Sequence, residues 1–225
     1  ISDGTNTTTY TYNGDGLRTK KVTGSKSTEY YILDGTYVGE KTIINSNTYI
    51  ISYVYDENGA PAGLNINGSA SYFVKNIQGD VLGLMSHTGT VFARYYYDAW
   101  GNLIYVKDGN GNNITNEEST ALLNPFRYRG YMYDSETGFY YVSSRYYDSE
   151  VGRWLNADTP DVLTATPNAL TDKNLFAYCD NNPVNRIDVT GYFWKEIGDF
   201  CENIWNGFVT SIEVEGGVGF GIGAN

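Results

Sequence analysis

Carboxylates are the side chains in this sequence that offer the most chemistry. The single histidine, His87, lies in a polar turn, and we interpret it as a surface residue rather than the base of a Ser/His/Asp or Cys/His site. Cys/His zinc sites lack ligands, and no glycine-rich loop ends in Lys-Ser or Lys-Thr to hold phosphate. Two close carboxylates do not both ionise easily, so one can polarise a peptide carbonyl with its proton while the other activates water.

Composition limits the partners. The 225 residues carry a formal net charge of -11, which makes nucleic acid and anionic membranes poor partners. The densest basic cluster, Arg18, Lys20 and Lys21, follows a turn and is predicted to be a solvated strand face. No uninterrupted apolar run is long enough to cross a bilayer. The chain opens and stops in the middle of its pattern, so we expect a piece of a longer protein whose export signals can lie outside it.

The two cysteines, Cys179 and Cys201, permit one disulfide without requiring it, and we favour independent thiols. No compartment follows from them. We expect no cofactor and no metal ion. The Asp/Asn-rich stretch from Asp108 to Ser119 is interpreted as an exposed loop, because it lacks the terminal glutamate of an EF-hand calcium loop, which is the alternative.

Tyrosine and glycine recur along the whole chain. The sequence contains 22 tyrosines and 26 glycines but only 5 prolines, a composition that favours β-structure with many turns. The tyrosine before each turn falls at positions 12, 55, 97, 133 and 147, so the chain is an array of repeats whose period shrinks at its end. In each turn Asp or Asn can bond the backbone, and Gly can adopt a positive φ. The turn residues are Asn13 and Gly16, Asp56 and Gly59, Asp98 and Gly101, Asp134 and Gly138, and Asp148 and Gly152.

The alternation of apolar and polar residues around these turns predicts an all-β fold of antiparallel hairpins. Strands are expected at 7–21 as a hairpin, and at 29–33, 36–44, 49–55, 63–66, 72–77, 81–86 and 91–97.

The second half of the chain carries an ordered set of motifs. They are Arg127 to Tyr131, Asp134 to Tyr141, Arg145 to Asp148, Gly152 to Trp154, Asn174 to Tyr178 and Asn181 to Asn185. Together with the repeat turns, these motifs resemble the tyrosine-aspartate (YD) repeats and core domain of Rhs proteins. The resemblance covers roughly 10–192 and implies a β-sheet shell built from spiralling repeats, in which the core domain closes one end of the shell.

The resemblance also implies a site for the carboxylate chemistry. Paired Asp-Pro-x-Gly motifs in similar Rhs proteins are associated with aspartyl self-cleavage, and Asp158 and Asp188 stand at the matching positions. Each lacks the following proline. The expected scissile bond joins Tyr192 to Phe193. Because of this departure we favour the interpretation that both aspartates cap turns at the end of the shell, with self-cleavage as the alternative.

Three segments are expected: a YD-repeat shell at 1–123, the core domain at 124–192, and the start of a variable C-terminal segment at 193–225. In the last segment, apolar residues at three- and four-residue steps from Trp194 to Phe208 predict an amphipathic helix. Alternation from Ile212 to Ile222 predicts a strand, with a pore-forming hairpin as the less favoured alternative.

The function expected from the resemblance is steric: a structural shell that encloses a C-terminal toxin of a bacterial polymorphic toxin system. Its partners would be that effector segment, upstream YD repeats and an immunity protein. No enzyme acting in trans is expected, and the location would be secreted or at the bacterial cell surface. The alternative is a cell-surface adhesin or carbohydrate-binding protein, with Trp100 and Trp154 as stacking platforms for glycans.

Overall fold

The computed structural model describes residues 1, 7–158, 174–188 and 195–196. Its largest element is a ten-stranded antiparallel sheet in which every strand lies beside the next one in sequence, as the expected hairpins require. The strands are β1 (Thr8–Tyr12), β2 (Arg18–Thr23), β3 (Lys26–Leu33), β4 (Thr36–Ile44), β5 (Asn47–Tyr55), β6 (Pro61–Ile66), β7 (Ser69–Lys75), β8 (Val81–Met85), β9 (Val91–Tyr97) and β10 (Leu103–Asp108).

Residues 114–158 and 174–188 are here called the core segment. It carries a four-stranded sheet of β11 (Met132–Asp134), β12 (Phe139–Val142), β13 (Arg145–Asp148) and β14 (Arg153–Trp154). Its short helices are α1 (Thr120–Leu123), η1 (Tyr128–Gly130) and η3 (Cys179–Asn181), and β15 (Arg186–Ile187) pairs with β16 (Lys195–Glu196).

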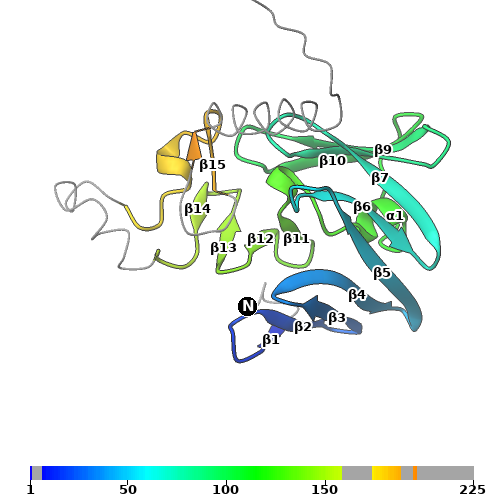
Figure 1. Ribbon diagram of the computed structural model, residues 1–225, viewed down its shortest axis with the longest axis horizontal. Helices are drawn as coiled ribbons and strands as arrows, with labels where there is room; N and C mark the ends of the chain where they lie inside the picture. The colour runs from blue at the N-terminus through cyan, green and yellow to red at the C-terminus, as the bar shows by residue number, and fades with distance from the viewer. Residues whose placement is uncertain (2–6, 159–173, 189–194, 197–225) are drawn as a thin grey trace, which may run out of the picture.

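The ten-stranded sheet curls, and α1 and β11 lie on its concave side (Figure 1). Alternation along each strand decides which side chains face inward. In β5, for example, Ile51 and Tyr53 are buried, whereas Ile50 and Val54 are exposed. The all-β prediction is therefore confirmed, with a sheet that presents an apolar inner face to the core segment.

One turn type joins many of the strands. In the turns that begin at Asn13, Asp56 and Asp98, one side-chain oxygen accepts hydrogen bonds from the backbone N–H groups two and four residues later. A glycine with positive φ follows three residues after the Asp or Asn. The same geometry occurs at Asn76 and Asp108, where the sequence analysis did not identify repeat turns.

Two expectations fail. Strand β10 was absent from the expected set because its residues, LIYVKD, alternate weakly. The expected helix is wrong at its start, because Lys195 and Glu196 pair with Ile187 and Arg186 as strand β16. The remainder of that helix and the strand expected from Ile212 lie outside the described residues.

Candidate functional site

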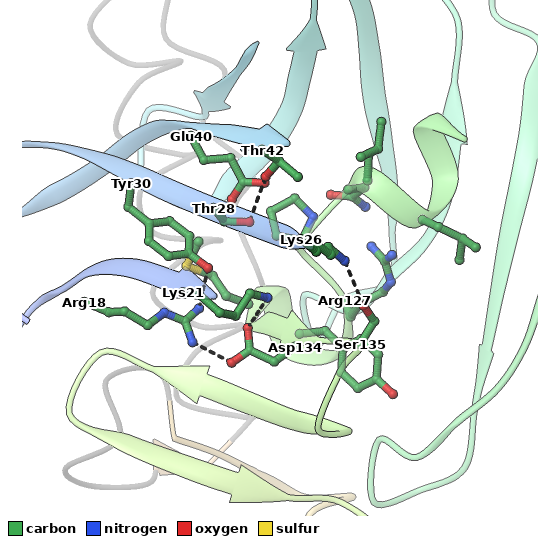
Figure 2. Close-up of a pocket in the computed structure, with 16 residues that line it drawn as sticks. Arg18, Lys21, Lys26, Thr28, Tyr30, Glu40, Thr42, Arg127, Asp134 and Ser135 are labelled. Atoms are coloured by element: carbon green, nitrogen blue, oxygen red, sulfur yellow. Dashed lines mark hydrogen bonds and ion pairs between the residues drawn. The ribbon is translucent and has the colours of Figure 1, made fainter. Parts of the chain in front are cut away.

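The sheet and the core segment meet in a buried cluster of charged side chains. Nη1 of Arg18 on β2 lies 2.5 Å from Oδ2 of Asp134, which ends β11. Nζ of Lys21, also on β2, lies 2.9 Å from the other oxygen of that carboxylate. Figure 2 shows both cations directed at Asp134. Arg18 and Asp134 are each 1% exposed, so this contact is made away from water.

A second carboxylate extends the charged cluster. Oxygens of Glu136 lie 2.8 Å from Lys21 Nζ and 2.6 Å from Lys26 Nζ. Burial would raise the pKa of Glu136, but the two ammonium groups outweigh burial and lower this pKa to about 2. Glu136 therefore stays ionised at any physiological pH.

This cluster corrects two expectations. Arg18 and Lys21 do not form a solvated face, because β2 lies against the core segment and both side chains are buried; Lys20 does face solvent, with 43% of its side chain exposed. Asp134 stands at its expected turn, but its carboxylate pairs with cations from β2 instead of with the turn backbone. Sequence reasoning missed this because nothing local to either segment indicates a partner more than a hundred residues away.

Aromatic side chains enclose the Arg18 guanidinium. Its carbon lies 4.3 Å from the centre of the Tyr141 ring and 4.8 Å from that of Tyr30. The Tyr30 hydroxyl also accepts a hydrogen bond from Arg18 Nη2. Tyr30 comes from the sheet and Tyr141 from the core segment, so one cation contacts both parts.

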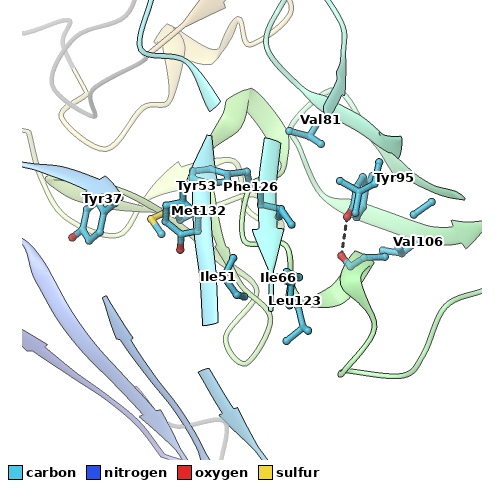
Figure 3. Close-up of a cluster of buried hydrophobic side chains, with 14 of the residues drawn as sticks. Tyr37, Ile51, Tyr53, Ile66, Val81, Tyr95, Val106, Leu123, Phe126 and Met132 are labelled. Carbon is cyan, nitrogen blue, oxygen red and sulfur yellow. Dashed lines mark hydrogen bonds between the residues drawn. The ribbon is translucent and has the colours of Figure 1, made fainter. Parts of the chain in front are cut away.

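The centre of the junction is apolar. Phe126 of the core segment packs edge-on against Tyr53 of β5, with 4.8 Å between the ring centres, and lies close to Met132 in the cluster drawn in Figure 3. The Tyr95 hydroxyl of β9 donates to the carbonyl of Ala121 in α1. These inner-face tyrosines bury their rings in the core and still satisfy their hydroxyls.

Three tyrosines of the core segment hold the β9–β10 turn. Their hydroxyls donate to three consecutive carbonyls of this turn: Tyr128 to Ala99, Tyr147 to Trp100 and Tyr140 to Gly101. A repeat turn that the sequence marked as a hairpin loop is therefore also a docking point for the core segment.

The two aspartates of the expected self-cleavage site meet at one cation. Arg145 of β13 reaches Asp158 Oδ2 with Nη1 at 2.9 Å and Asp188 Oδ2 with Nη2 at 3.0 Å. Its guanidinium carbon also lies 4.1 Å from the ring centre of Trp154. Burial lowers the pKa of Arg145, and the two carboxylates oppose this change. The structure thus brings Asp158 and Asp188 together, although thirty positions separate them in the sequence.

The chemistry open to this arrangement is limited by the cation. Both carboxylates bind the same guanidinium. A peptide-cleaving pair has to reach the scissile carbonyl and the attacking water, so one aspartate would have to leave Arg145 first. The Tyr131 hydroxyl donates to the Asp188 carbonyl, which fixes the backbone just before the expected cleavage point. Tyr192 and Phe193 lie outside the described residues.

The other residues that the sequence analysis considered for binding or catalysis lie in the core or in surface turns. Trp154 is 2% exposed and cannot stack on a glycan, and half-buried Trp100 packs against Gly152. His87 lies exposed in the β8–β9 turn. Cys179 is buried, whereas Cys201 lies outside the described residues, so the independence of the two thiols stays a prediction.

Two of the expected turn residues belong to the last hairpin of the core segment. Asp148 accepts hydrogen bonds from the backbone of Glu150 and Val151, and Gly152 has a φ of 66°. Gly138, after Asp134, has a φ of 75°. At Asp108 the carboxylate bonds Asn110 and Asn112, as in the repeat turns.

Within the described ranges, no three His, Cys, Asp or Glu side chains are grouped so that they could hold a metal ion. Over the same ranges, no helix has the length and apolar character needed to span a bilayer.

The fold is similar to that of solved TcdB2-TccC3 structures. A crystal structure of TcdB2-TccC3 without its hypervariable C-terminal region superimposes with a TM-score of 0.61 and 23% identity, over 85% of this chain and 9% of that one. A second crystal structure of TcdB2-TccC3 gives the same TM-score and the same identity, over 85% of this chain and 10% of that one.

Curated relatives are much longer than this chain. The tRNA nuclease WapA of Bacillus subtilis (strain 168) is 34% identical over 186 residues, which is 82% of this chain and 7% of the relative. Teneurin-4 of Mus musculus is 26% identical over 196 residues, 85% of this chain and 7% of the relative. The family model described as teneurin YD-shell matches residues 41–184, which is more than half of the sequence. The chain therefore belongs to the teneurin YD-shell family.

Proposed function

We propose that this segment is a wall of a shell, with its closing core, and that the shell encloses a C-terminal effector of the same polypeptide. The observation that carries the proposal is the junction itself. A curled sheet holds α1 and β11 of the core segment on its concave side and is fastened to this segment by the buried pairs of Asp134 with Arg18 and Lys21. A wall closed by an internal segment excludes proteases and keeps an enclosed chain from its target.

The comparisons support a toxin context for this shell. WapA is named as a tRNA nuclease, and this chain matches only 7% of its length, so such an activity would reside in another part of the polypeptide. One TcdB2-TccC3 structure was solved without a hypervariable C-terminal region, so a variable segment follows the matched fold in that protein. The proposed partners are thus the effector segment, upstream YD repeats and an immunity protein that neutralises the released effector, in a secreted or surface-bound protein of competing bacteria.

Protection of the effector tests this proposal. We expect the C-terminal segment of the full-length protein to resist a protease that degrades the same segment when it is produced alone. Asp134→Asn, which removes the carboxylate that Arg18 and Lys21 share, should increase cleavage of the C-terminal segment, and Lys20→Gln on the exposed side of β2 should not. Equal cleavage of the enclosed and the isolated segment would overturn the proposal.

A second candidate function is self-cleavage in cis between Tyr192 and Phe193. The observation that favours it is the meeting of Asp158 and Asp188 at Arg145. In the reaction one carboxylate would take a proton from water, the other would donate a proton to the peptide carbonyl, and hydrolysis would leave a carboxylate on Tyr192 and an amine on Phe193.

The intact mass of the protein, measured over time, distinguishes self-cleavage from a structural clamp, in which Arg145 only holds Asp158 and Asp188 in place. Self-cleavage predicts two fragments that meet at Tyr192, absent in both Asp158→Asn and Asp188→Asn. A clamp predicts an uncut chain in which either variant lowers stability, as removal of one partner from a buried ion pair does. A chain that stays whole at all times would end the protease hypothesis.

A further inference from the structure

A small cavity lies beside the buried charged cluster, between strands β2 to β4 and the stretch of the core segment that leads from α1 to β11. It measures about 30 Å³ on a scale on which one water molecule needs roughly 10–15 Å³. Its lining includes four cationic side chains, Arg18, Lys21, Lys26 and Arg127. Figure 2 shows them around this one space.

Arg127 is the unusual member of this lining. Its side chain is 2% exposed, and Nη1 and Nη2 donate to the carbonyls of Phe126 and Ala121. In the described part of the chain, no carboxylate lies within ion-pair distance of Arg127. The ring of Tyr95 lies 4.3 Å from the guanidinium carbon. A buried cation without an anionic partner is costly, so an anion at this place would be stabilised.

Two N–H donors of the lining residues lack acceptors. Nε of Arg18 and Nε of Arg127 are both buried, and neither has a hydrogen-bond partner in the structure. Buried donors normally have a partner, and these two belong to cations that line the same cavity. Both observations indicate a ligand that accepts hydrogen bonds.

The balance of charge also favours an anion. Against the four cations stand three carboxylates: Asp134 and Glu40 in the lining, and Glu136 paired with Lys21 and Lys26. Glu40 accepts hydrogen bonds from Tyr53 and Thr42. Burial raises the pKa of Glu40, which favours its neutral form. Even with all three carboxylates ionised, the group retains an excess positive charge.

We propose that the cavity binds one small monatomic anion, chloride under ordinary conditions, between Arg127 and the charged cluster. The size of the cavity decides the class of ligand, because a space for about two water molecules is too small for sulfate, phosphate or a carboxylate-bearing metabolite. The bound anion would neutralise Arg127 and tie the stretch between α1 and β11 to the sheet. This assignment is independent of whether the shell encloses an effector.

Bromide identifies the site directly. Crystals of the protein grown with bromide in place of chloride should give an anomalous peak in the cavity, in contact with Arg127. In solution, replacing gluconate by chloride at constant ionic strength should raise the melting temperature. The expected rise is about 3–6 °C for each tenfold increase above the dissociation constant.

Two variants separate specific binding from a general salt effect. Lys26→Gln removes a cation whose side chain is 20% exposed at the rim, and should reduce the chloride-dependent rise while the fold persists. Lys20→Gln removes the same charge from the exposed side of the sheet and should leave that rise unchanged. A cavity without a bromide peak, or equal chloride dependence in both variants, would overturn the proposal and leave water as the occupant.

Discussion

Arg18 and Asp134 are 116 positions apart in sequence and form an ion pair of 2.5 Å in which both side chains are 1% exposed. One belongs to the second strand of the curled sheet and the other to the first strand of the core segment. A contact of this kind is sensitive to the loss of one partner, because the remaining charge stays buried.

Removal of the Asp134 charge should loosen the junction. Asp134→Asn leaves Arg18 and Lys21 without their shared carboxylate, and we expect a loss of about 3–5 kcal/mol in the free energy of unfolding. Urea denaturation measures this loss. Glu29→Gln breaks the exposed pair with Lys20 at the surface of the same sheet and should leave the urea midpoint nearly unchanged. An Asp134→Asn protein as stable as its parent would show that the pair does not hold the core segment.

Stability should fall in acid through Glu136. Its pKa is lowered to about 2 in the folded protein, below the ordinary value of 4.5, so the folded state binds fewer protons than the unfolded state in this range. The stabilisation, of the order of 3 kcal/mol, is present above pH 4.5 and is lost as the pH falls toward 2.

The matched comparison for this pH dependence is Glu136→Gln. Urea midpoints at pH 6, 4 and 3 should converge between the parent and this variant as the pH falls. Glu40 contributes with the opposite sign, because burial raises its pKa, but it is present in both proteins and cancels in the difference. A constant difference from pH 6 to pH 3 would contradict the role of Glu136.

Gly101 should resist replacement more than a turn glycine of the same conformation. Its φ is +87°, and a Cβ there would overlap the Tyr128 ring. Gly89 has a φ of +84° with open space around it. Gly89→Ala should therefore lower the free energy of unfolding only by the cost of placing an alanine at positive φ, roughly 1–2 kcal/mol. Gly101→Ala should lose clearly more in the same denaturation experiment, and equal losses would show that the turn can move away from Tyr128.

The thiol of Cys179 should react slowly in the folded protein. It is 1% exposed, and burial raises its pKa to about 12, so almost none of it is thiolate at neutral pH. In a Cys201→Ala background, iodoacetamide at pH 8 should leave the mass unchanged until urea unfolds the chain. Fast alkylation of the folded protein would place Cys179 at the surface.

The sequence by itself determined the hairpins. Residues such as Asn13, Asp56 and Asp98 bond their own backbone a few positions later, and the inward alternation of Ile51 and Tyr53 has a period of two. Both signals are local, so they are readable without the fold. The Rhs-type motifs likewise indicated the family.

Only the tertiary structure decided which charges are buried and whom they meet. Arg18 and Lys20 are two positions apart on one strand, and nothing around them in sequence tells the cation that binds Asp134 from the one that faces water. The convergence of Asp158 and Asp188 on Arg145 depends in the same way on how the core segment folds back on itself. The hydrogen bonds of a turn join residues at most four positions apart, whereas the curvature of the sheet determines which distant residue a buried charge contacts.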